Sequence, residues 1–343
     1  MIKCGIIGLG KMGISHYAII NAHPDVSLIA VCDTSGLILN GLNKYNEVQT
    51  FKDYRKMIDK CNLDCVIIAT PTSSHAKIIQ YAMEHNIHVF VEKPFCFNLE
   101  DGRDLTNLAL QRNLVNQVGY HNRFIGVFQE TRKLLDQGAI GDVYNFTAEA
   151  YGQVVLKQKN STWRMKRSEG GGCLYDYASH VIDLVNYLIG PPEEVCGTVL
   201  KSIFSRDVAD AVYSTFLYNN GKSGRLAVNW SDKTYRKMST QITVYGTTGK
   251  IIADRQECRI YLWNADGFGK LKQGWNILYT TDLTKPVWFY LRGEEYSAQI
   301  DYFVKRVKSN ESENINSFAS ALRTDITVDL LLNDAGKRNF SHG

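Results

Sequence analysis

One stretch of sequence limits the possible folds of this chain more than any other. An apolar run leads straight into Gly8, Gly10 and Gly13, and a helical pattern starts at once. A second apolar run follows that helix and ends at Asp33. A strand, a glycine-rich turn, a helix and a strand that ends in an acidic residue are, in this order, typical of a dinucleotide-binding βαβ unit. We therefore expect a parallel sheet covered by helices at the start of the chain.

The spacing of the three glycines fits the binding of a pyrophosphate. Gly8 permits the tight turn, Gly10 leaves no side chain between backbone and ligand, and Gly13 lets the helix pack closely on the strand. Lys11 and Met12 open the helix, whose first amide groups are available to phosphate oxygens. These five residues form the first part of the predicted cofactor site.

Asp33 indicates which dinucleotide binds. Its carboxylate can accept hydrogen bonds from the two hydroxyl groups of a ribose, whereas it would repel a 2′-phosphate. Neither Thr34 nor Ser35 supplies a compensating positive charge. The sequence thus favours NAD, with NADP the less favoured cofactor. The alternative is a glycine-rich turn without a ligand, in which Asp33 only ends a strand.

Length and composition restrict the class of protein. With 343 residues the chain is long for one core, so two domains are expected, over residues 1–121 and 122–343. A net charge of +4 without a long basic run argues against a nucleic-acid partner. No apolar run approaches the ~18 residues that span a bilayer, and the first strand begins too early for a signal peptide. We expect a cytoplasmic protein without a membrane partner.

The eight cysteines predict neither disulfides nor a metal site. Cys4, Cys32, Cys65 and Cys173 fall in expected strands or beside candidate site residues, and their spacing forms no regular framework, so buried reduced thiols are expected. Cys61 lies near Cys65, but no second pair at zinc spacing accompanies them in the sequence.

The first 120 residues alternate apolar runs with helical patterns, as a parallel sheet with covering helices requires. Strands are predicted at 2–7, 27–32, 65–69, 88–91 and 115–118, and helices at 12–21, 53–60, 74–85 and 99–112. Such sheets bind ligands beyond the carboxyl ends of their strands. Besides the glycine turn and Asp33, that edge carries candidate residues in three loops: Thr70, Pro71 and His75, then Glu92 and Lys93, and then Tyr120, His121 and Arg123.

The second half of the chain changes from a helical to a two-residue period. Polar and apolar residues alternate from Tyr144 to Tyr151, which predicts a strand with two unlike faces. Further strands are predicted at 194–204, 211–219, 224–231, 240–246 and 258–263, and helices at 124–137, 174–188, 296–308 and 317–332. The result is a largely antiparallel sheet with helices on one side. Its other face, with aromatic residues such as Tyr213 or Phe216, would invite a second copy, so a homodimer or homotetramer is expected.

Lys93 is the first candidate for the chemistry. It follows the predicted strand 88–91, so its ammonium group would reach the ligand edge, where it can hold a substrate oxygen and stabilise negative charge on it. Pro94 fixes the backbone behind it and is compatible with a cis peptide bond. The alternative is an exposed lysine before an ordinary turn.

A second candidate group lies after the three consecutive glycines 170–172. Asp176, His180 and Asp183 are spaced at i, i+4 and i+7, which places them on one face of the predicted helix. Carboxylates beside a histidine can orient its ring and keep its basicity near neutral pH, as proton transfer with a hydroxyl demands. The alternatives are a buried structural histidine and a metal site, and the sequence offers no second histidine at suitable spacing for a metal.

Seven segments together resemble the Gfo/Idh/MocA oxidoreductase family. They are GLGKMG at 8–13, TPTSSH at 70–75, EKP at 92–94, GYHNRF at 119–124, Trp163-Arg164, GGGCLYDYASHVIDLVNYLIG at 170–190 and VYGTTGKI at 244–251. These segments extend over nearly the whole chain in the order that the family has.

The resemblance implies a fold and a reaction. The fold is α/β, with an N-terminal Rossmann domain followed by an α+β domain with a large, open, mostly antiparallel sheet. The reaction is NAD-dependent oxidation of a secondary ring hydroxyl, or reduction of the ketone, in a small-molecule carbohydrate or cyclitol. Lys93 would orient the reacting oxygen, His180 would be the general acid/base, and Asp176 would position substrate or tune His180. Ala178, where the family often has glycine, and the bulky Tyr177 leave the identity of the substrate open.

The loop before the three glycines bears on the substrate. Trp163 and Arg164 are candidate substrate-binding residues, and Arg164, Lys166 and Arg167 together could grip a phosphate or carboxylate. Such a grip would favour a sugar phosphate, a nucleotide sugar or a uronic acid over a neutral sugar. The alternative is a solvated basic loop.

Two other functions stay open at this point. A tightly held NAD on the same scaffold could support glycoside hydrolysis through transient oxidation, without net production of NADH. The third possibility is a non-catalytic protein that senses a nucleotide, although such a sensor has no need of Lys93, Asp176 and His180.

Overall fold

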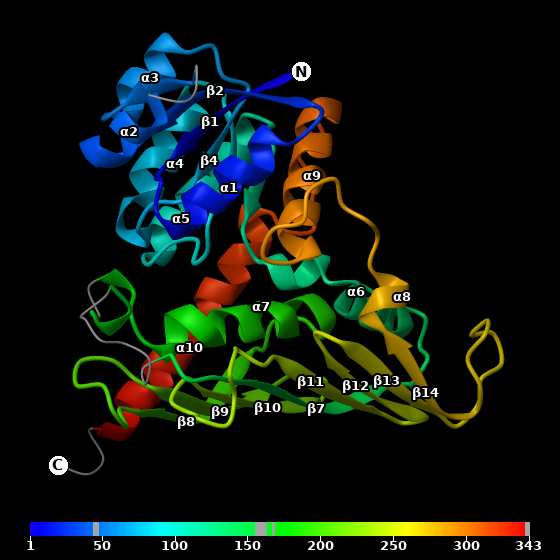
Figure 1. The fold of residues 1–343 in the computed structure, drawn as a ribbon. Coiled ribbons are helices and arrows are strands. Elements are labelled where there is room, and N and C mark those ends of the chain that lie inside the picture. Colours follow the sequence, from blue (N-terminus) through cyan, green and yellow to red (C-terminus); the bar gives the residue numbers. More distant parts are fainter. Residues whose placement is uncertain (44–47, 155–162, 167–168, 340–343) are drawn as a thin grey trace. The chain divides into compact units, whose positions relative to one another are not determined.

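The computed structural model describes residues 1–43, 48–154, 163–166 and 169–339, and the chain divides into two compact units (Figure 1). The first unit contains residues 1–121 and 286–322, and the second contains 122–285 and 323–343. The sequence analysis expected the second domain to continue unbroken to the end of the chain. The structure instead assigns residues 286–322 to the first unit, because a helix in that segment completes its core.

The first unit is built on a parallel sheet with the strand order β3-β2-β1-β4-β5-β6. Its strands are β1 (Ile2–Ile7), β2 (Val26–Cys32), β3 (Gln49–Phe51), β4 (Cys65–Ile68), β5 (His88–Val91) and β6 (Asn116–Val118). Five of them were predicted from apolar runs. The sequence analysis missed β3, because a partly exposed edge strand of three residues leaves no hydrophobic pattern.

Polar side chains cap two of the helices of this unit at their first residues. Asp53 accepts a hydrogen bond from the backbone N–H of Arg55, and Asn98 does the same for Glu100, which fixes the starts of two helices. The helices are α1 (Lys11–Asn21), α2 (Gly36–Asn43), α3 (Tyr54–Lys60), α4 (His75–Glu84) and α5 (Leu99–Gln111). Only α2 was not expected from the sequence.

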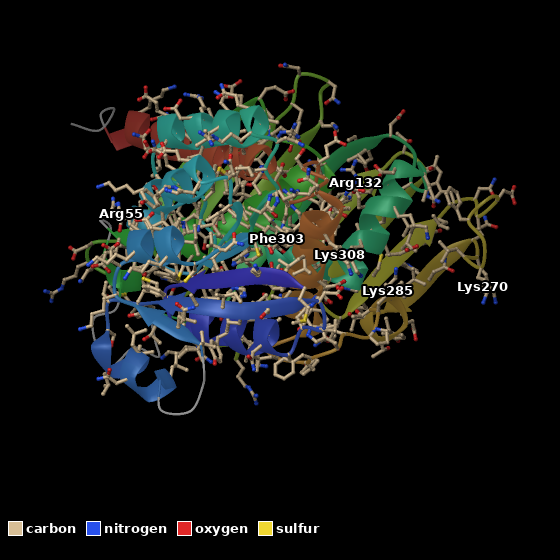
Figure 2. All side chains as sticks on the ribbon, turned by 90° about the horizontal axis from the view of Figure 1, so that it is seen from above. Arg55, Arg132, Lys270, Lys285, Phe303 and Lys308 are labelled. Carbon is tan, nitrogen blue, oxygen red and sulfur yellow. The ribbon has the colours of Figure 1, made fainter. Side chains whose placement is uncertain are left out.

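Helix α9 (Glu294–Ser309) returns to the first unit from late in the chain. Its side chains Ile300, Phe303 and Val304 are almost fully buried and belong to one apolar cluster with Ile6 and Phe90 of the sheet. The rings of Phe303, labelled in Figure 2, and Phe90 lie 5.9 Å apart in an edge-to-face arrangement. Burial of this apolar face holds the segment 286–322 on the first unit.

The second unit contains an eight-stranded sheet with the order β14-β13-β12-β11-β7-β10-β9-β8. Its strands are β7 (Val143–Tyr151), β8 (Glu194–Lys201), β9 (Ala211–Leu217), β10 (Ser223–Asn229), β11 (Gln241–Gly246), β12 (Gly249–Asp254), β13 (Glu257–Leu262) and β14 (Gly274–Tyr279). All neighbouring pairs are antiparallel except β7 and β10. The mostly antiparallel sheet expected from the sequence is confirmed, although β12 and β14 were not predicted.

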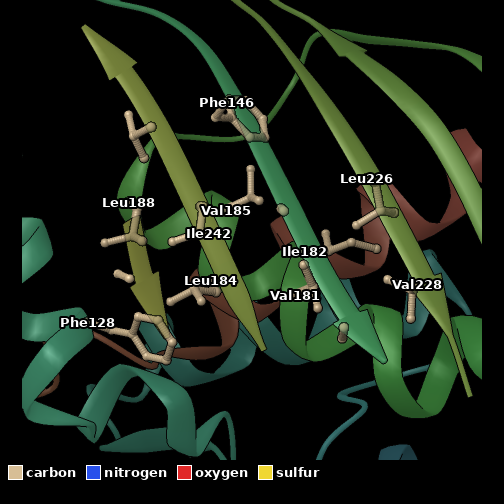
Figure 3. Packing of buried hydrophobic residues seen from close by; sticks show 14 of the residues in the cluster. Phe128, Phe146, Val181, Ile182, Leu184, Val185, Leu188, Leu226, Val228 and Ile242 are labelled. Atoms are coloured by element: carbon tan, nitrogen blue, oxygen red, sulfur yellow. The ribbon is translucent and has the colours of Figure 1, made fainter. Parts of the chain in front are cut away.

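Helices cover one face of this sheet, and the opposite face has no helix against it in the described part of the second unit (Figure 1). They are α6 (Gly126–Asp136), α7 (Ser179–Leu188) and the second half of α10 (Phe318–Asn339), with the short α8 (Thr280–Leu283) beside α6 and β14. Figure 3 shows the core between helices and sheet, where Val185 of α7 lies near Phe146 and Ile242 and Ile182 lies toward Leu226.

The alternation of strand residues decides which side chains reach the open face. Tyr213 lies there and is 38% exposed, as expected. Phe216 does not, because it is buried at 0% exposure among the helices on the other side. The exposed residues of β14 on the open face, Trp275 and Ile277, were not foreseen.

The fold shows the state of the cysteines and the character of the helices. All eight cysteines are free thiols, and seven of them are buried, as the sequence analysis expected. Within the described parts of the chain, no helix combines the length and the apolar character that crossing a bilayer would demand.

We predict that Gly224 of β10 is required for the core of the second unit. A Cβ atom there would lie 2.1 Å from the ring of Phe146 on the neighbouring strand. The variant Gly224→Ala should lower the free energy of unfolding by about 1–3 kcal/mol. The double variant Gly224→Ala/Phe146→Leu should lose less than the sum of the single variants, because leucine makes room for the methyl group. Urea unfolding of the three variants measures this, and wild-type stability of Gly224→Ala would contradict it.

Candidate active site

The glycine turn after β1 has the geometry that the sequence analysis expected. Gly8 has φ +92°, a conformation that disfavours any other residue. A Cβ on Gly13 would lie 1.8 Å from the carbonyl oxygen of Gly8, so only glycine fits there. At Gly10 a Cβ would meet no heavy atom within 4 Å. Two of the three glycines are therefore required by the fold, whereas the third leaves open space at the start of α1.

That open space is suited to an anion. Gly10 is the N-cap of α1, and no side chain caps the helix at this end. The amide groups of Lys11, Met12 and Gly13 have no acceptor within the helix, because the first helical turn never provides one. Together with the positive end of the helix dipole they form a cradle for a phosphate group. The residues present thus fit the pyrophosphate of a dinucleotide.

Asp33 is held at the rim of this turn. Its Oδ2 accepts a hydrogen bond of 2.6 Å from the backbone N–H of Leu9, and its Oδ1 accepts one of 2.7 Å from Ser35. Each carboxylate oxygen can accept a further hydrogen bond. Asp33 is therefore anchored to the glycine turn itself and retains acceptor capacity for the hydroxyl groups of a ribose.

Lys93 follows β5 at the same edge of the sheet. Glu92 continues the ladder through its backbone N–H, which donates to Ile68 at 2.9 Å, and its Oε2 accepts a hydrogen bond of 3.3 Å from the backbone N–H of Lys93. The peptide bond between Lys93 and Pro94 is cis, as the sequence analysis allowed. Lys93 is partly exposed at the carboxyl end of a parallel strand, where this class of sheet binds ligands.

His75 joins two loops of this edge. Its Nδ1 lies 3.1 Å from the carbonyl oxygen of Pro94 and 3.3 Å from that of Phe95, and its Nε2 lies 3.0 Å from that of Thr70. The residue is 1% exposed, and burial lowers the pKa of His75 although the carbonyl groups oppose this shift. These contacts hold the loops after Thr70 and Lys93 together.

In the second unit, Asp176, His180 and Asp183 form a polar stripe. Asp176 lies on a π-helical turn, Leu174–Ala178, which continues directly into α7. Asp176 is 6% exposed, and its Oδ2 accepts a hydrogen bond of 2.7 Å from Nε of Arg164. Gly172 ties the same loop down, because its backbone N–H donates to the carbonyl of Arg164 at 2.9 Å. Turns of this wider type are rare and occur often at functional sites.

Asp183 lies seven residues after Asp176, on α7, and has a different partner. Arg123 donates two hydrogen bonds to it, from Nε at 2.9 Å and from a terminal nitrogen at 2.6 Å. Burial raises the pKa of Asp183, and the charge and hydrogen bonds of Arg123 oppose that shift. Asp183 thus anchors α7 to the segment around Arg123. His180 lies on the first turn of α7 and is 7% exposed.

The buried carboxylate of Asp210 fixes a loop that contacts the residue after the glycines 170–172. Asp210 accepts hydrogen bonds from three consecutive backbone amides, 203–205, and from Nε1 of Trp230. Burial raises the pKa of Asp210, but a hydrogen bond from the hydroxyl group of Ser205, together with those from Trp230 and the backbone amides, outweighs burial and lowers the pKa. The loop that Asp210 fixes ends at Ala209, whose carbonyl accepts from the backbone N–H of Cys173 at 2.8 Å. The start of the π-helical turn is thereby held in place.

The remaining residues predicted to bind substrate are mostly buried and contact other parts of their own unit. Tyr120 is 1% exposed and belongs to the core of the first unit. The ring of His121 packs on that of Tyr296, with centroids 4.7 Å apart. Arg123 is 4% exposed and donates hydrogen bonds to Asp183. The side chain of Trp163 lies outside the described structure.

The basic loop has carboxylate partners in its described part. Arg164 pairs with Asp176, and Nζ of Lys166 lies 2.9 Å from Glu169. Arg167 lies outside the described residues. The sequence analysis missed the pair of Arg164 and Asp176, because an ion pair between a loop and a helical turn leaves no periodic signal.

Comparisons with known proteins agree with this geometry. Residues 2–120 match the model of an oxidoreductase family with an NAD-binding Rossmann fold, of the Gfo/Idh/MocA type. Residues 128–252 match the model of the Gfo/Idh/MocA C-terminal domain. The fold class expected from the sequence is confirmed by these matches and by the two sheets.

Among the relatives, the myo-inositol 2-dehydrogenase of Thermotoga maritima is 25% identical over 349 residues, which cover 98% of this chain and 96% of that protein. The 2,7-anhydro-N-acetylneuraminate hydratase of Escherichia coli is 28% identical over 270 residues, 75% of this chain and 68% of that protein. A solved levoglucosan dehydrogenase in complex with NADH has the same fold, with a TM-score of 0.87 at 23% identity over 98% of this chain and 97% of that chain. The two family matches follow one another along the sequence, and the chain is therefore a member of the Gfo/Idh/MocA oxidoreductase family with an NAD-binding Rossmann domain in residues 2–120.

Proposed function

We propose that this chain is an NAD-dependent dehydrogenase that interconverts a secondary ring hydroxyl and a ketone in a sugar, a sugar phosphate, a nucleotide sugar or a cyclitol. The observation that carries the proposal is the placement of Lys93 on the same sheet edge as a glycine turn that fits a pyrophosphate. The names of the relatives support it, since two of those compared are inositol and levoglucosan dehydrogenases.

The proposed cofactor site uses the first unit. The amides of Lys11, Met12 and Gly13 would hold the pyrophosphate, and Asp33 would accept hydrogen bonds from the adenosine ribose. Thr70 and Pro71 belong to the next loop of the edge, and Glu92 and Lys93 to the one after it. When bound, NAD supplies the nicotinamide ring that exchanges a hydride with the substrate carbon.

The proposed chemistry of the protein is proton transfer and charge stabilisation. The ammonium group of Lys93 would donate a hydrogen bond to the reacting oxygen and stabilise negative charge on it as its proton leaves. The imidazole of His180 would take that proton in oxidation and return it in reduction. Asp176, held by Arg164, would keep a fixed negative charge beside the substrate and accept a hydrogen bond from a neighbouring hydroxyl.

The carboxylate partners of the basic loop bear on the substrate class. Because Arg164 and Lys166 each have an acidic partner in the structure, we propose neutral sugars and cyclitols as the first compounds to test. The ion pair of Lys166 and Glu169 is exposed to solvent, and exposed ion pairs contribute little to stability. An anionic substrate could therefore take the place of Glu169 beside Lys166. Phosphorylated and nucleotide-linked sugars therefore belong in the same panel.

The test of the proposal is a panel of neutral sugars, cyclitols and their phosphorylated and nucleotide-linked forms, followed by the absorbance of NADH. A dehydrogenase should give net NADH with at least one compound. The hydratase among the relatives favours a second candidate, a hydration or hydrolysis with only transient oxidation. That function would show product by chromatography without net NADH, and a protein that binds NAD without converting any compound would remove both proposals.

We predict that His180→Ala lowers kcat by about a hundredfold or more, because the hydroxyl then has no positioned base. The dissociation constant for NADH, measured by fluorescence, should change little. The control is His85→Ala, which removes an exposed histidine at the end of α4 and should leave kcat unchanged. Unchanged turnover of His180→Ala would exclude the proposed role.

We predict that Gly10→Ala and Gly13→Ala separate ligand binding from folding. The methyl group at position 10 meets no protein atom, so the thermal midpoint should stay close to that of the wild type, whereas the affinity for NADH should fall about tenfold or more because the methyl blocks the phosphate. Gly13→Ala should lower the thermal midpoint itself, because its methyl clashes with the backbone of Gly8. Wild-type affinity of Gly10→Ala would speak against a pyrophosphate in this turn.

We propose further that copies of this chain associate through the open face of the second sheet, as a homodimer or homotetramer. Three exposed residues of β14 alternate with inward-facing ones: Trp275, Ile277 and Tyr279 are 55%, 48% and 50% exposed. Trp275 is the cross-strand neighbour of Tyr261, and their rings lie 5.4 Å apart. On β13, Arg259 and Glu257 lie opposite Ile277 and Tyr279 and form an ion pair, so the face combines exposed apolar and charged side chains. A mixed surface of this kind is typical of a protein–protein contact.

We predict that Ile277→Arg lowers the oligomeric mass measured by light scattering after gel filtration. A charge between Trp275 and Tyr279, beside Arg259, would have to lose its water on association. Ile203→Arg is the matched control, because Ile203 is 51% exposed but lies in the loop after β8. If the wild type is a monomer, or if Ile277→Arg keeps the wild-type mass, this face is not the contact.

A further inference from the structure

A buried histidine joins helix α1 of the first unit to the loop that carries Lys93. His16 lies on α1 and is 0% exposed. Its Nε2 lies 2.7 Å from Oε1 of Glu92, the residue between β5 and Lys93. Its ring packs edge-to-face on that of Phe90, with centroids 5.2 Å apart. One side chain thus connects the helix that starts at the glycine turn with the loop that carries the lysine.

The surroundings of His16 determine the direction of this hydrogen bond. In the described part of the chain, Nδ1 of His16 is buried without a hydrogen-bond partner. A proton on Nδ1 would be an unsatisfied buried donor, so we assign the proton to Nε2, which then donates to the carboxylate of Glu92. A bond to a charged acceptor is among the stronger hydrogen bonds in proteins. Among the residues that the structure describes, none accepts a proton from Nδ1, so we assign His16 as a hydrogen-bond donor to Glu92 and not as a proton relay.

The second oxygen of Glu92 faces the lysine loop. Oε2 accepts the backbone N–H of Lys93 at 3.3 Å. A Cβ on Gly119 would lie 3.1 Å from the same oxygen, so the carboxylate also packs directly against that backbone. Glu92 is therefore held between His16 on one side and the backbone of Lys93 and Gly119 on the other. A shift of His16 would therefore move Glu92 and, with it, the backbone amide of Lys93.

We propose that His16 is a positioning residue through which the occupied phosphate turn places Lys93, an inference that rests on the proposed cofactor site. Gly10 and His16 belong to one continuous helix and lie roughly 9 Å apart along its axis, so they move as a unit. A pyrophosphate at the amino end of α1 fixes that helix, His16 fixes Glu92, and Glu92 fixes the backbone of Lys93. Binding of the adenosine diphosphate half of NAD thereby orders the residue that handles the substrate oxygen.

The test is hydrogen–deuterium exchange of the peptide that spans residues 89–97, with and without ADP. ADP has the adenosine and the pyrophosphate of NAD but neither the second ribose nor the nicotinamide, so it lacks the part of the cofactor proposed to lie near Lys93. In the wild type, saturating ADP should slow exchange of these amides about fivefold or more, the usual lower range of coupling between two sites. In His16→Leu, ADP should still bind, but this slowing should be lost.

Two variants separate positioning from general stability. His16→Gln keeps an N–H donor near the place of Nε2 and should restore most of the response to ADP. His23→Leu is the matched control, since His23 is also buried, at 5% exposure, but packs on Trp288 with ring centroids 4.4 Å apart. It should lower the thermal midpoint and keep the response. If His16→Leu does not fold, Glu92→Gln weakens the same bond from the other side and should lose the response.

Each outcome decides the proposal. A response to ADP that persists in His16→Leu overturns it, and so does a response that is lost equally in His23→Leu and His16→Gln. Failure of the wild type to bind ADP overturns both this inference and the cofactor site. Absence of turnover in the sugar panel bears only on the proposed reaction, because exchange requires no substrate. Where turnover is found, His16→Leu should lower kcat severalfold while the dissociation constant for NADH stays within about twofold of the wild type.

Discussion

The approach of Gly13 to the carbonyl oxygen of Gly8 is the constraint on which the ligand edge of the first unit depends. No side chain larger than hydrogen fits at Gly13, so α1 can lie close to the end of β1 only with this residue. The close packing directs the amino end of the helix, with its unpaired amide groups, into the space above the sheet. Asp33 is then tied to the same turn through the amide of Leu9. A single steric requirement thus places the anion cradle and the acidic residue together.

The second unit depends on the pairing of buried charges, because it carries the carboxylates of Asp176 and Asp183 on an otherwise apolar helical segment. An uncompensated buried carboxylate would cost several kcal/mol, so each must have a partner. Asp176 is paired with Arg164 from the loop before the glycines, and Asp183 with Arg123. These pairs also fix the rotation of the segment that carries His180. The stability of the polar stripe and the orientation of the proposed base are consequences of the same contacts.

The sequence was informative where a periodic or steric rule acts, and silent where distant residues meet. Hydrophobic runs and the glycine spacing were enough for the first sheet, for the antiparallel character of the second and for the cofactor class. The π-helical turn before α7 was invisible, since its residues also fit an ordinary helical pattern. So were the pairing of His16 with Glu92, 76 residues apart, and the burial of Arg123. Phe216 was expected on the open face because alternation alone does not say which face of a strand a helix covers.

The return of α9 to the first unit makes the two units inseparable by a single cut. The chain passes from one unit to the other after residue 121, again after 285 and a third time after 322. A fragment that ends at residue 121 would contain every strand of the parallel sheet, yet it would expose the apolar surface around Ile6 and Phe90 that α9 covers. Any shortened form of the first unit therefore has to include residues 286–322, which follow most of the second unit in the sequence. Loss of the last quarter of the chain removes parts of both units.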